Sequence, residues 1–275
     1  MPLSLAVIVL LTILGLGAPL QTQEAGAEAS PYVEKSRREI NFYPGGKVDL
    51  TLALPGHVTI TGWERSTIVV EIEKLVRRLP EDQAKALAAQ HPVRVRHTQT
   101  ITTITVNAPP KPPENIEVNL TLLVPKQRTD LKLQIAKGNL AVSNLTGWID
   151  ATLAEGSMRM SSISGYFAGI TKLGDVEVDL TGKRWEGYGV TVATNRGSVL
   201  LRVPSEYSAA LQLETREGDL SIDYPEQLVE GESVPLTATA FKKGKSLKAT
   251  VGDGGSPIKL MTVLGNLRLE TKQAP

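Results

Sequence analysis

The sequence predicts an all-β chain folded as a single-stranded β-solenoid, in which short strands stack coil upon coil, with an N-terminal β segment and one short helix. First, 41% of the 275 residues are hydrophobic but only 4% are aromatic, so the core must come from aliphatic side chains, which favour strands. Second, apolar and polar residues alternate over several segments after residue 45. Third, a short phrase centred on glycine returns several times from residue 131 onward.

Residues 1–29 have the pattern of a secretory signal peptide. An apolar run extends from Leu5 to about Leu16, and the small residues Ala27 and Ala29 follow a polar stretch as cleavage points. An uncleaved membrane anchor is the alternative, but the run is shorter than the roughly 20 residues of a spanning helix. We therefore expect an exported protein of the periplasm, cell envelope or extracellular space, with no membrane span in the mature chain unless this segment stays uncleaved.

The composition excludes several classes of function. Lys and Arg together number 30 against 29 Asp and Glu, a balance that gives no electrostatic footprint for nucleic acid. The chain has no cysteine, which excludes disulfides, thiolate chemistry and thiol-held metal. The histidines, His57, His91 and His97, lack the spacing of metal ligands. We expect no cofactor, no metal and no nucleic-acid partner.

Residues 30–130 are expected to form the N-terminal β segment. Apolar residues alternate with polar ones near 47–52, 58–60 and 68–72, and this period of two predicts half-buried strands. Two further strands flank the stretch APPKPPEN. Because proline donates no hydrogen bond to a sheet, we predict that this stretch is a stiff hairpin loop joining them.

One short helix is predicted near residues 80–90, within LPEDQAKALAAQHP. Pro80 suits the first turn of a helix, Glu81 and Asp82 follow it, alanines fill the interior, and Pro92 marks the end. We expect this helix to cap an open end of the sheet, since that is the usual role of a helix beside stacked strands.

The repeats occupy residues 131–275 and continue directly from the preceding segment. Each contains a glycine followed by Asn, Ser or Asp, and these glycines are Gly138, Gly156, Gly174, Gly197, Gly218 and Gly265. The second and fourth residues after each glycine are apolar. Glycine adopts positive φ without strain and the polar residue can bond its own backbone, so each phrase predicts a tight corner between two strands. One coil cannot bury its apolar face alone, so successive coils are expected to stack in chain order.

A second set of glycines falls near the middle of the early repeats, at Gly147, Gly165 and Gly182. With the first set, they predict a corner about every nine residues, which coils the chain. Within the phrase GNLAVSNLTG, we expect Leu140, Val142 and Leu145 to lie in the core.

The order of these elements resembles the bacterial putative-adhesin family of β-solenoid domains of unknown function, which is related to toastrack-type envelope domains. The matching pieces are GHVTITGWERSTIVVE, NIEVNLTLLVPKQRTDLKLQIAKGNLAVSNLTG and the two glycine phrases after it, so the resemblance covers most of residues 45–225. It implies an exported solenoid with an adhesin-like surface, and it transfers no catalytic residues. Residues from about 228 to 256 depart from the pattern, and the resemblance assigns them no structure.

The stretch GDVEVDL places several carboxylates on one face of a strand and invites a catalytic or calcium-binding interpretation. Alignment of the repeats puts Arg159 beside Glu177 in the preceding coil, and Arg202 and then Asp223 beside Asp179 in the following ones. In a parallel stack these residues become neighbours of opposite charge. We therefore predict a solvated charge ladder, no catalytic residues and no enzymatic activity.

The aromatic residues of the insertion KRWEGYG are the candidate binding residues. Insertions in a solenoid emerge as loops on one face, often the binding face. Trp185 and Tyr188, with Arg184 beside them, are predicted to stack on sugar rings or to anchor a partner protein, or alternatively to fold back over the coil. Trp63 and Trp148 follow corner glycines and are expected to cover an end or edge of the core.

These observations lead to one main hypothesis and two alternatives. The main one is an exported, non-enzymatic cell-envelope protein with an adhesin-like surface, binding an envelope protein or a glycan through its long faces or residues 183–189, or acting as a scaffold. The first alternative is a structural or sensory component that self-associates. The second is a polysaccharide-acting enzyme, which rests on analogy between folds alone.

Overall fold

A computed structural model describes residues 30–43, 45–225, 227–229, 232–234, 236–241 and 243–272. The signal segment predicted for residues 1–29 lies outside these ranges. Over these ranges the chain is mostly β with one helix, α1 (Glu81–Gln90), so the all-β prediction and the predicted helix are confirmed. Within the described ranges, no helix is long and apolar enough to cross a membrane.

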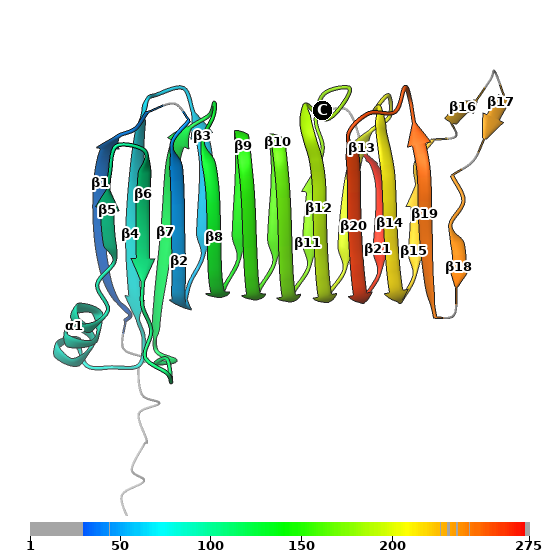
Figure 1. Ribbon diagram of the computed structural model, residues 1–275. Coiled ribbons are helices and arrows are strands. Elements are labelled where there is room, and N and C mark those ends of the chain that lie inside the picture. The colour runs from blue at the N-terminus through cyan, green and yellow to red at the C-terminus, as the bar shows by residue number, and fades with distance from the viewer. Residues whose placement is uncertain are drawn as a thin grey trace, which may run out of the picture.

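The strands form two long faces that lie opposite each other, one toward the viewer of Figure 1 and one behind it. Hydrogen-bonded neighbours on the front face are, in order, β5 (Arg94–His97), β6 (Ile101–Val106), β2 (Lys47–Pro55), β8 (Asp130–Lys137), the second half of β9 (Leu140–Glu155), the second half of β10 (Met158–Leu173), β12 (Gly187–Arg196), β20 (Pro257–Leu264), β14 (Ala209–Glu217), β19 (Gly244–Val251) and β18 (Thr239–Phe241).

The back face begins at the same end of the molecule. Its neighbours are, in order, β1 (Tyr32–Asn41), β4 (Thr67–Val76), β7 (Ile116–Pro125), β3 (Val58–Trp63), the first halves of β9 and β10, β11 (Val176–Asp179), β13 (Val199–Pro204), β21 (Leu267–Lys272) and β15 (Leu220–Asp223). Two short strands, β16 (Gln227–Val229) and β17 (Glu232–Val234), pair apart from these faces.

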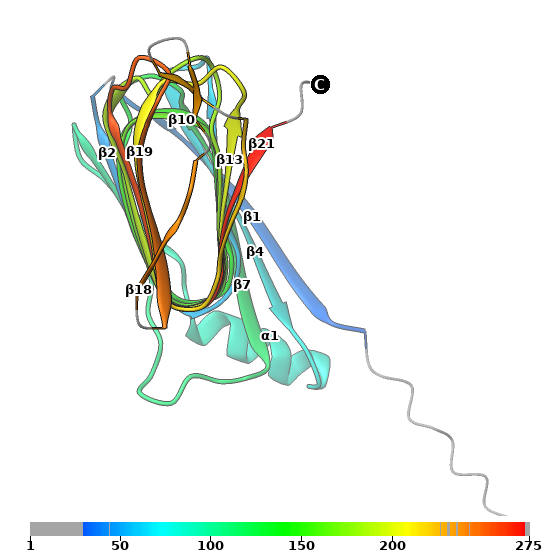
Figure 2. The ribbon, with the colours of Figure 1, turned by 90° about the vertical axis from the view of Figure 1, so that its right-hand side faces the viewer.

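Parallel pairing brings equivalent positions of the glycine phrases side by side. We call a front-face strand and the back-face strand that follows it a coil. Met158 pairs with Leu140 of the preceding coil and Val176 of the following one, both 18 residues away. The view along the stack shows the strands superposed as two walls (Figure 2). Because the pairing is in register, apolar residues meet apolar residues between the walls.

The core between the walls is aliphatic. Leu140, Val142 and Leu145 are each 1% exposed, as predicted, and equivalent residues of the other coils are buried with them. Tyr207 and Phe167 are the largest side chains with less than 2% of their surface exposed. The regular alternation of buried and exposed residues along β2 and β8 reflects the period of two on which the strand predictions depended.

A column of glycines forms the lower corner of the stack in Figure 1, where front strands turn into back strands. The six predicted corner glycines have positive φ, from +130° at Gly156 to +159° at Gly265. A Cβ atom on Gly156 would lie well under 3.0 Å from the carbonyl oxygen of Gly138 in the adjacent coil. Gly56 extends the column into the N-terminal segment, which the sequence patterns did not indicate. Glycine is therefore required here by close approach as well as by φ.

The polar residue after three of the six corner glycines, namely Asn139, Asp175 and Asn266, joins one coil to the next. Asn139 Oδ1 accepts a hydrogen bond from the backbone N–H of Ser157 at 3.0 Å, and Asp175 Oδ1 accepts one from Ser198 at 2.7 Å. We predicted bonds to each residue's own backbone, which holds for Asp219 and Leu220. For Asn139, Asp175 and Asn266 the expectation is wrong, because the parallel stack places the N–H groups of the adjacent coil within reach.

The order of coils departs from chain order at the C-terminal end. The last coil, β20–β21, lies between β12–β13 and β14–β15 and pairs in parallel with both. The prediction of stacking in chain order is wrong here, because β19 pairs antiparallel with the outer edge of β14 and leaves its inner edge for the returning chain. β16 to β19 account for most of the segment to which no structure was assigned.

The N-terminal end shows the same kind of exchange. The coil β2–β3 lies between β8–β9 and the strands β6 and β7. The stretch APPKPPEN is not a hairpin loop, because β6 belongs to the front face and β7 to the back face. Helix α1 lies beside this end (Figure 1), and its Ala84 and Ala88 pack into the core.

Ion pairs join strands at this end of the molecule. Lys74 is buried, donates to the carbonyl oxygen of Ala88 at 2.9 Å and pairs with Glu34 at 2.8 Å, which ties α1 to β4 and β1. Glu117 on β7 accepts a hydrogen bond from Arg77 at 2.7 Å. Burial opposes ionisation of Glu117, but hydrogen bonds and nearby positive charge outweigh it and hold its pKa below the ordinary value.

Candidate binding surface

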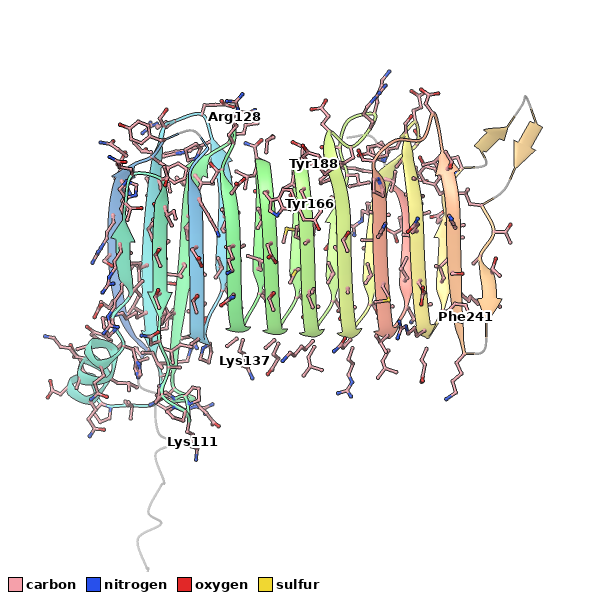
Figure 3. All side chains as sticks on the ribbon, viewed as in Figure 1. Lys111, Arg128, Lys137, Tyr166, Tyr188 and Phe241 are labelled. Carbon is pink, nitrogen blue, oxygen red and sulfur yellow. The ribbon has the colours of Figure 1, made fainter. Side chains whose placement is uncertain are left out.

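Three aromatic side chains from consecutive coils gather where the chain enters the front face. We call Trp148, Tyr166 and Tyr188 the aromatic cluster. The ring centroids of Trp148 and Tyr166 are 4.1 Å apart, and those of Trp148 and Tyr188 are 6.2 Å apart. Figure 3 shows both tyrosines near the upper corner of the stack. Trp148 is 50% exposed and Tyr188 is 77% exposed, which is unusual for rings of this size.

The register of the strands brings the first two rings together. Trp148 and Tyr166 are paired residues of β9 and β10, each directly after a glycine of the upper corner. Gly147 and Gly165 stack there as predicted, but Gly187 continues the column in place of Gly182. The insertion before β12 therefore moves the corner five residues along the chain.

Tyr188 is turned outward by a β-bulge. Gly187 pairs with Gly165 and Gly189 pairs with Tyr166, so Tyr188 is an extra residue in its strand. Both flanking glycines have positive φ, +132° and +121°. Bulges redirect side chains and are frequent beside binding sites. The backbone here is thus shaped to present one tyrosine ring to solvent.

The three residues predicted from the insertion have different environments. Trp185 is 5% exposed, and its Nε1 donates to the carbonyl oxygen of Gly165 at 3.0 Å, so this ring folds over the coil. Tyr188 points outward in the aromatic cluster. Arg184 is exposed, and its backbone forms an isolated bridge with Ser208. The geometry therefore joins Tyr188 to Trp148 and Tyr166, and not to Trp185.

The polar atoms of the aromatic cluster are free within the described ranges. Neither Trp148 Nε1 nor the hydroxyl groups of Tyr166 and Tyr188 bond another described residue. By contrast, Trp63 Nε1 donates to the carbonyl oxygen of Thr67 at 2.8 Å. Buried tryptophan and tyrosine usually satisfy their polar atoms within the protein. The cluster thus offers both ring faces and hydrogen-bonding groups to a ligand.

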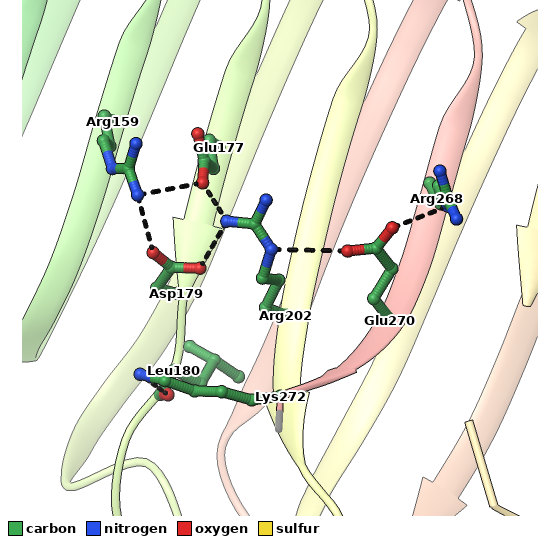
Figure 4. A network of polar contacts seen from close by, with 8 residues as sticks. All are labelled: Arg159, Glu177, Asp179, Leu180, Arg202, Arg268, Glu270 and Lys272. Carbon is green, nitrogen blue, oxygen red and sulfur yellow. Dashed lines mark hydrogen bonds and ion pairs between the residues drawn. The ribbon is translucent and has the colours of Figure 1, made fainter. Parts of the chain in front are cut away.

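The predicted charge ladder lies on the back face as one connected network (Figure 4). Arg159 lies 3.3 Å from Glu177 and 3.6 Å from Asp179, and Arg202 pairs with the same two carboxylates. Arg202 also lies 3.3 Å from Glu270, which takes the place predicted for Asp223 because β21 lies between β13 and β15. That part of the prediction is wrong.

Electrostatics explain why this network is a poor candidate for catalysis. Partial burial opposes the charge on Arg202, but the hydrogen bonds that it donates to Glu177 and Asp179, together with their negative charge, outweigh burial and raise its pKa. Each carboxylate of the network has a guanidinium partner, whereas an acid catalyst needs a carboxyl whose pKa is raised. No group of three or more metal-ligating side chains occurs among the described residues.

A groove of about 680 Å³ runs along the back face beside the lower corner. Its lining includes His57, Asn139 and Asp175, whose side chains already accept hydrogen bonds from the next coil's backbone. These acceptor atoms serve the stack, and two further lining residues, Arg159 and Glu177, belong to the charge network. The aromatic cluster, whose polar atoms are free, is therefore the better candidate for a binding surface.

Comparison with known proteins gives structural neighbours alone. No family model and no curated protein matches the chain. A putative cell adhesion protein from Clostridium sporogenes has 12% identity and a TM-score of 0.42, over 88% of this chain and 100% of its own. A putative adhesin from Bacteroides fragilis has 11% identity and a TM-score of 0.30, over 86% of this chain and 97% of its own. A putative adhesin from Parabacteroides distasonis has 9% identity and a TM-score of 0.27, over 87% of this chain and 97% of its own.

Proposed function

We propose that the chain is an exported, non-enzymatic cell-envelope protein that binds an envelope protein or a glycan through the aromatic cluster. In this proposal residues 1–29 are a signal peptide, residues 30–130 form the N-terminal segment, and residues 131–275 form a β-solenoid continuous with it. In-register parallel pairing at a spacing of 18 residues supports the solenoid.

The exposure of the aromatic cluster is the observation that carries this proposal. Large rings contribute to stability by being buried, and Tyr188 leaves most of its surface in water. Tyrosine and tryptophan are also the residues that most often dominate binding energies. The cluster therefore fits a surface kept for a ligand, whereas the paired carboxylates of the back face argue against an enzyme.

Self-association is the less favoured alternative. The edge strand β1 pairs with β4 and with no other described strand, and such an edge invites pairing with a second chain. However, β1 carries Lys35, Arg37 and Arg38, and charged side chains on an edge oppose that pairing. At the other end, β18 and β19 extend the front face beyond β14.

Binding to bacterial envelope fractions tests the proposal. The purified chain should sediment with envelope material, and the double variant Trp148→Ala/Tyr188→Ala should lose this binding while keeping its melting temperature. Tyr43→Ala is the matched control, because Tyr43 is 67% exposed at the N-terminal end. Equal binding by the double variant and the parent would overturn the proposed surface. Mass spectrometry of the exported chain tests the signal peptide, with cleavage expected after Ala27 or Ala29.

A further inference from the structure

We infer that the ligand of the aromatic cluster is a neutral glycan whose sugar rings stack on Trp148 and Tyr188. This inference rests on the proposed function and names its ligand class. It follows from three properties of the surface: the chemistry of the rings, the polar row beside them and the balance of charge around them.

The aromatic faces and the polar groups of the cluster match the apolar faces and the hydroxyl groups of a sugar. A pyranose ring presents C–H groups on its faces and hydroxyl groups around its rim. An exposed aromatic face is complementary to the C–H groups, and the free indole N–H and phenol groups of the cluster can bond the hydroxyls. A purely apolar partner would leave those polar atoms buried without hydrogen bonds, which is unfavourable.

A polar row of Asp150, Ala168 and Thr191 lies next to the cluster on the front face. These residues are paired across β9, β10 and β12, and they stand two positions after Trp148 and Tyr166 along the strands, on the same face. Asp150 and Thr191 are exposed, and Asp150 makes no ion pair with a described residue. Ala168, in the middle of the row, has a short side chain and leaves room for a ligand above it. A ring held on the cluster would thus have a carboxylate acceptor and a hydroxyl beside it.

Charged residues of both signs surround the cluster in nearly equal number. Lys183 and Arg184 are exposed on the loop that leads to Tyr188, and neither makes an ion pair with a described residue. Glu186 on the same loop and Asp150 on the front face are likewise exposed and unpaired in the described ranges. Lys132 and Lys259 are paired with Asp150 and Thr191, and Asp130 accepts a hydrogen bond from the backbone N–H of Trp148. Four cations and three carboxylates leave no strong excess of positive charge, which favours an uncharged ligand over an acidic polysaccharide.

The limited size of the surface favours a glycan over a folded protein. A stable protein interface buries about 800 Å² on each partner and involves roughly 20–30 residues a side. Here three rings are bordered by small or polar residues, including the hydroxyls of Thr146 and Ser164, which bond each other at 2.7 Å. A few sugar units would cover this area.

Titration with oligosaccharides tests the inference. The purified full chain would be titrated by calorimetry and tryptophan fluorescence against cellohexaose, xylohexaose, mannohexaose and maltohexaose, with polygalacturonate as the acidic probe. The fluorescence should report binding, because Trp148 is half exposed while Trp185 is buried. We expect at least one neutral oligosaccharide to bind, and Trp148→Ala and Tyr188→Ala to weaken it by about tenfold or more.

Matched variants separate ring stacking from other effects. Tyr188→Phe keeps the ring and should keep most of the affinity, and Asp150→Asn should weaken binding without changing the melting temperature. Tyr43→Ala should bind as the parent does. Neutral oligosaccharides that fail to bind, or that bind all variants equally, would refute the glycan inference, as would binding to polygalacturonate alone.

The same variants distinguish this failure from failure of the proposed function. If the double variant Trp148→Ala/Tyr188→Ala loses binding to an envelope protein and no glycan binds, the ligand class is wrong and the binding surface stands. If the cluster affects binding to neither envelope fractions nor sugars, both proposals fall.

Discussion

Replacing Gly156 by alanine tests whether close packing at the glycine column holds the stack together. Gly156 connects β9 to β10 with φ of +130°, and a Cβ atom there would overlap the carbonyl oxygen of Gly138. That oxygen belongs to the backbone of the adjacent coil and cannot swing aside as a side chain could. Alanine therefore meets backbone strain and a steric clash together.

The size of the effect follows from these two causes. Because φ lies outside the small left-handed region open to L-residues, strain costs about 1–3 kcal/mol. Relieving the clash moves the coils apart and weakens two corner hydrogen bonds, Gly138 N–H to Glu155 at 2.8 Å and Gly156 N–H to Leu173 at 2.7 Å. Each contributes about 1 kcal/mol. We expect Gly156→Ala to lower the free energy of unfolding by about 3–5 kcal/mol.

Two further variants separate the causes in guanidinium unfolding followed by circular dichroism. Gly182→Ala meets strain alone, since φ is +77° and no atom lies within 4 Å of the added Cβ. Gly56→Ala meets the clash alone, because its φ is not positive but its Cβ would overlap the carbonyl oxygen of Val118. Each should cost less than Gly156→Ala. If Gly156→Ala were no more destabilising than Gly182→Ala, the argument from close coil packing would be refuted.

Three other variants test the charges and the order of coils. Arg202→Met should lower the free energy of unfolding by about 2 kcal/mol, because it leaves three partly buried carboxylates without their shared cation, whereas Arg268→Met should cost under about 0.5 kcal/mol by the same measurement. Glu117→Gln should destabilise the chain at pH 7 but not in acid. The pKa of Glu117 is lowered below its ordinary value of 4.5, so the Glu117 carboxylate contributes its full stability above pH 4.5. This contribution is lost as the pH falls through the lowered pKa. Deleting residues 253–275 should abolish amide protection in residues 209–223, measured by hydrogen exchange, because the deleted coil lies between them and the rest of the stack.

Each of these tests has an outcome that would contradict its premise. Equal losses for Arg202→Met and Arg268→Met would mean that the network contributes no more than an exposed ion pair. A stability difference between the parent and Glu117→Gln that persists at low pH would point to packing and not charge. Protection of residues 209–223 in the truncated chain would show that the terminal coil does not need its inner neighbour.

The middle of the stack could be predicted from sequence because its spacing is constant. Between Gly138 and Gly174 equivalent residues of the phrases are 18 positions apart, and the structure pairs residues at this same spacing. Aligning the phrases therefore gives the pairing of the strands. The positions of the last coils could not be predicted in this way. Leu267 and Leu220 are interchangeable as neighbours of Val199, since each presents an aliphatic side chain in the same register. The choice depends on the antiparallel pairing of β19, which lies outside the repeated phrases.

The candidate site could be predicted only in part, because two of its rings follow the regular spacing and the third lies in the insertion. The insertion marked Tyr188 and Trp185 equally, and composition could not show that a bulge turns one ring outward while the other bonds Gly165. Trp148 and Tyr166 were identifiable as neighbours from their spacing of 18 residues. Their outward direction follows from the alternation along each strand, because each stands one residue before a buried side chain, Ile149 or Phe167.

The bulge at Tyr188 bears most directly on function because the stack does not require it. The corner glycines, the aliphatic core and the bonds between coils maintain the fold without contact from the Tyr188 ring, which is 77% exposed. A bulge interrupts the ladder of hydrogen bonds, here between β10 and β12. A regular strand without the extra residue would pair with β10 in the register used by β9. The local structure therefore gives up stability to hold one aromatic ring beside Trp148, and a ligand that binds both rings would account for it.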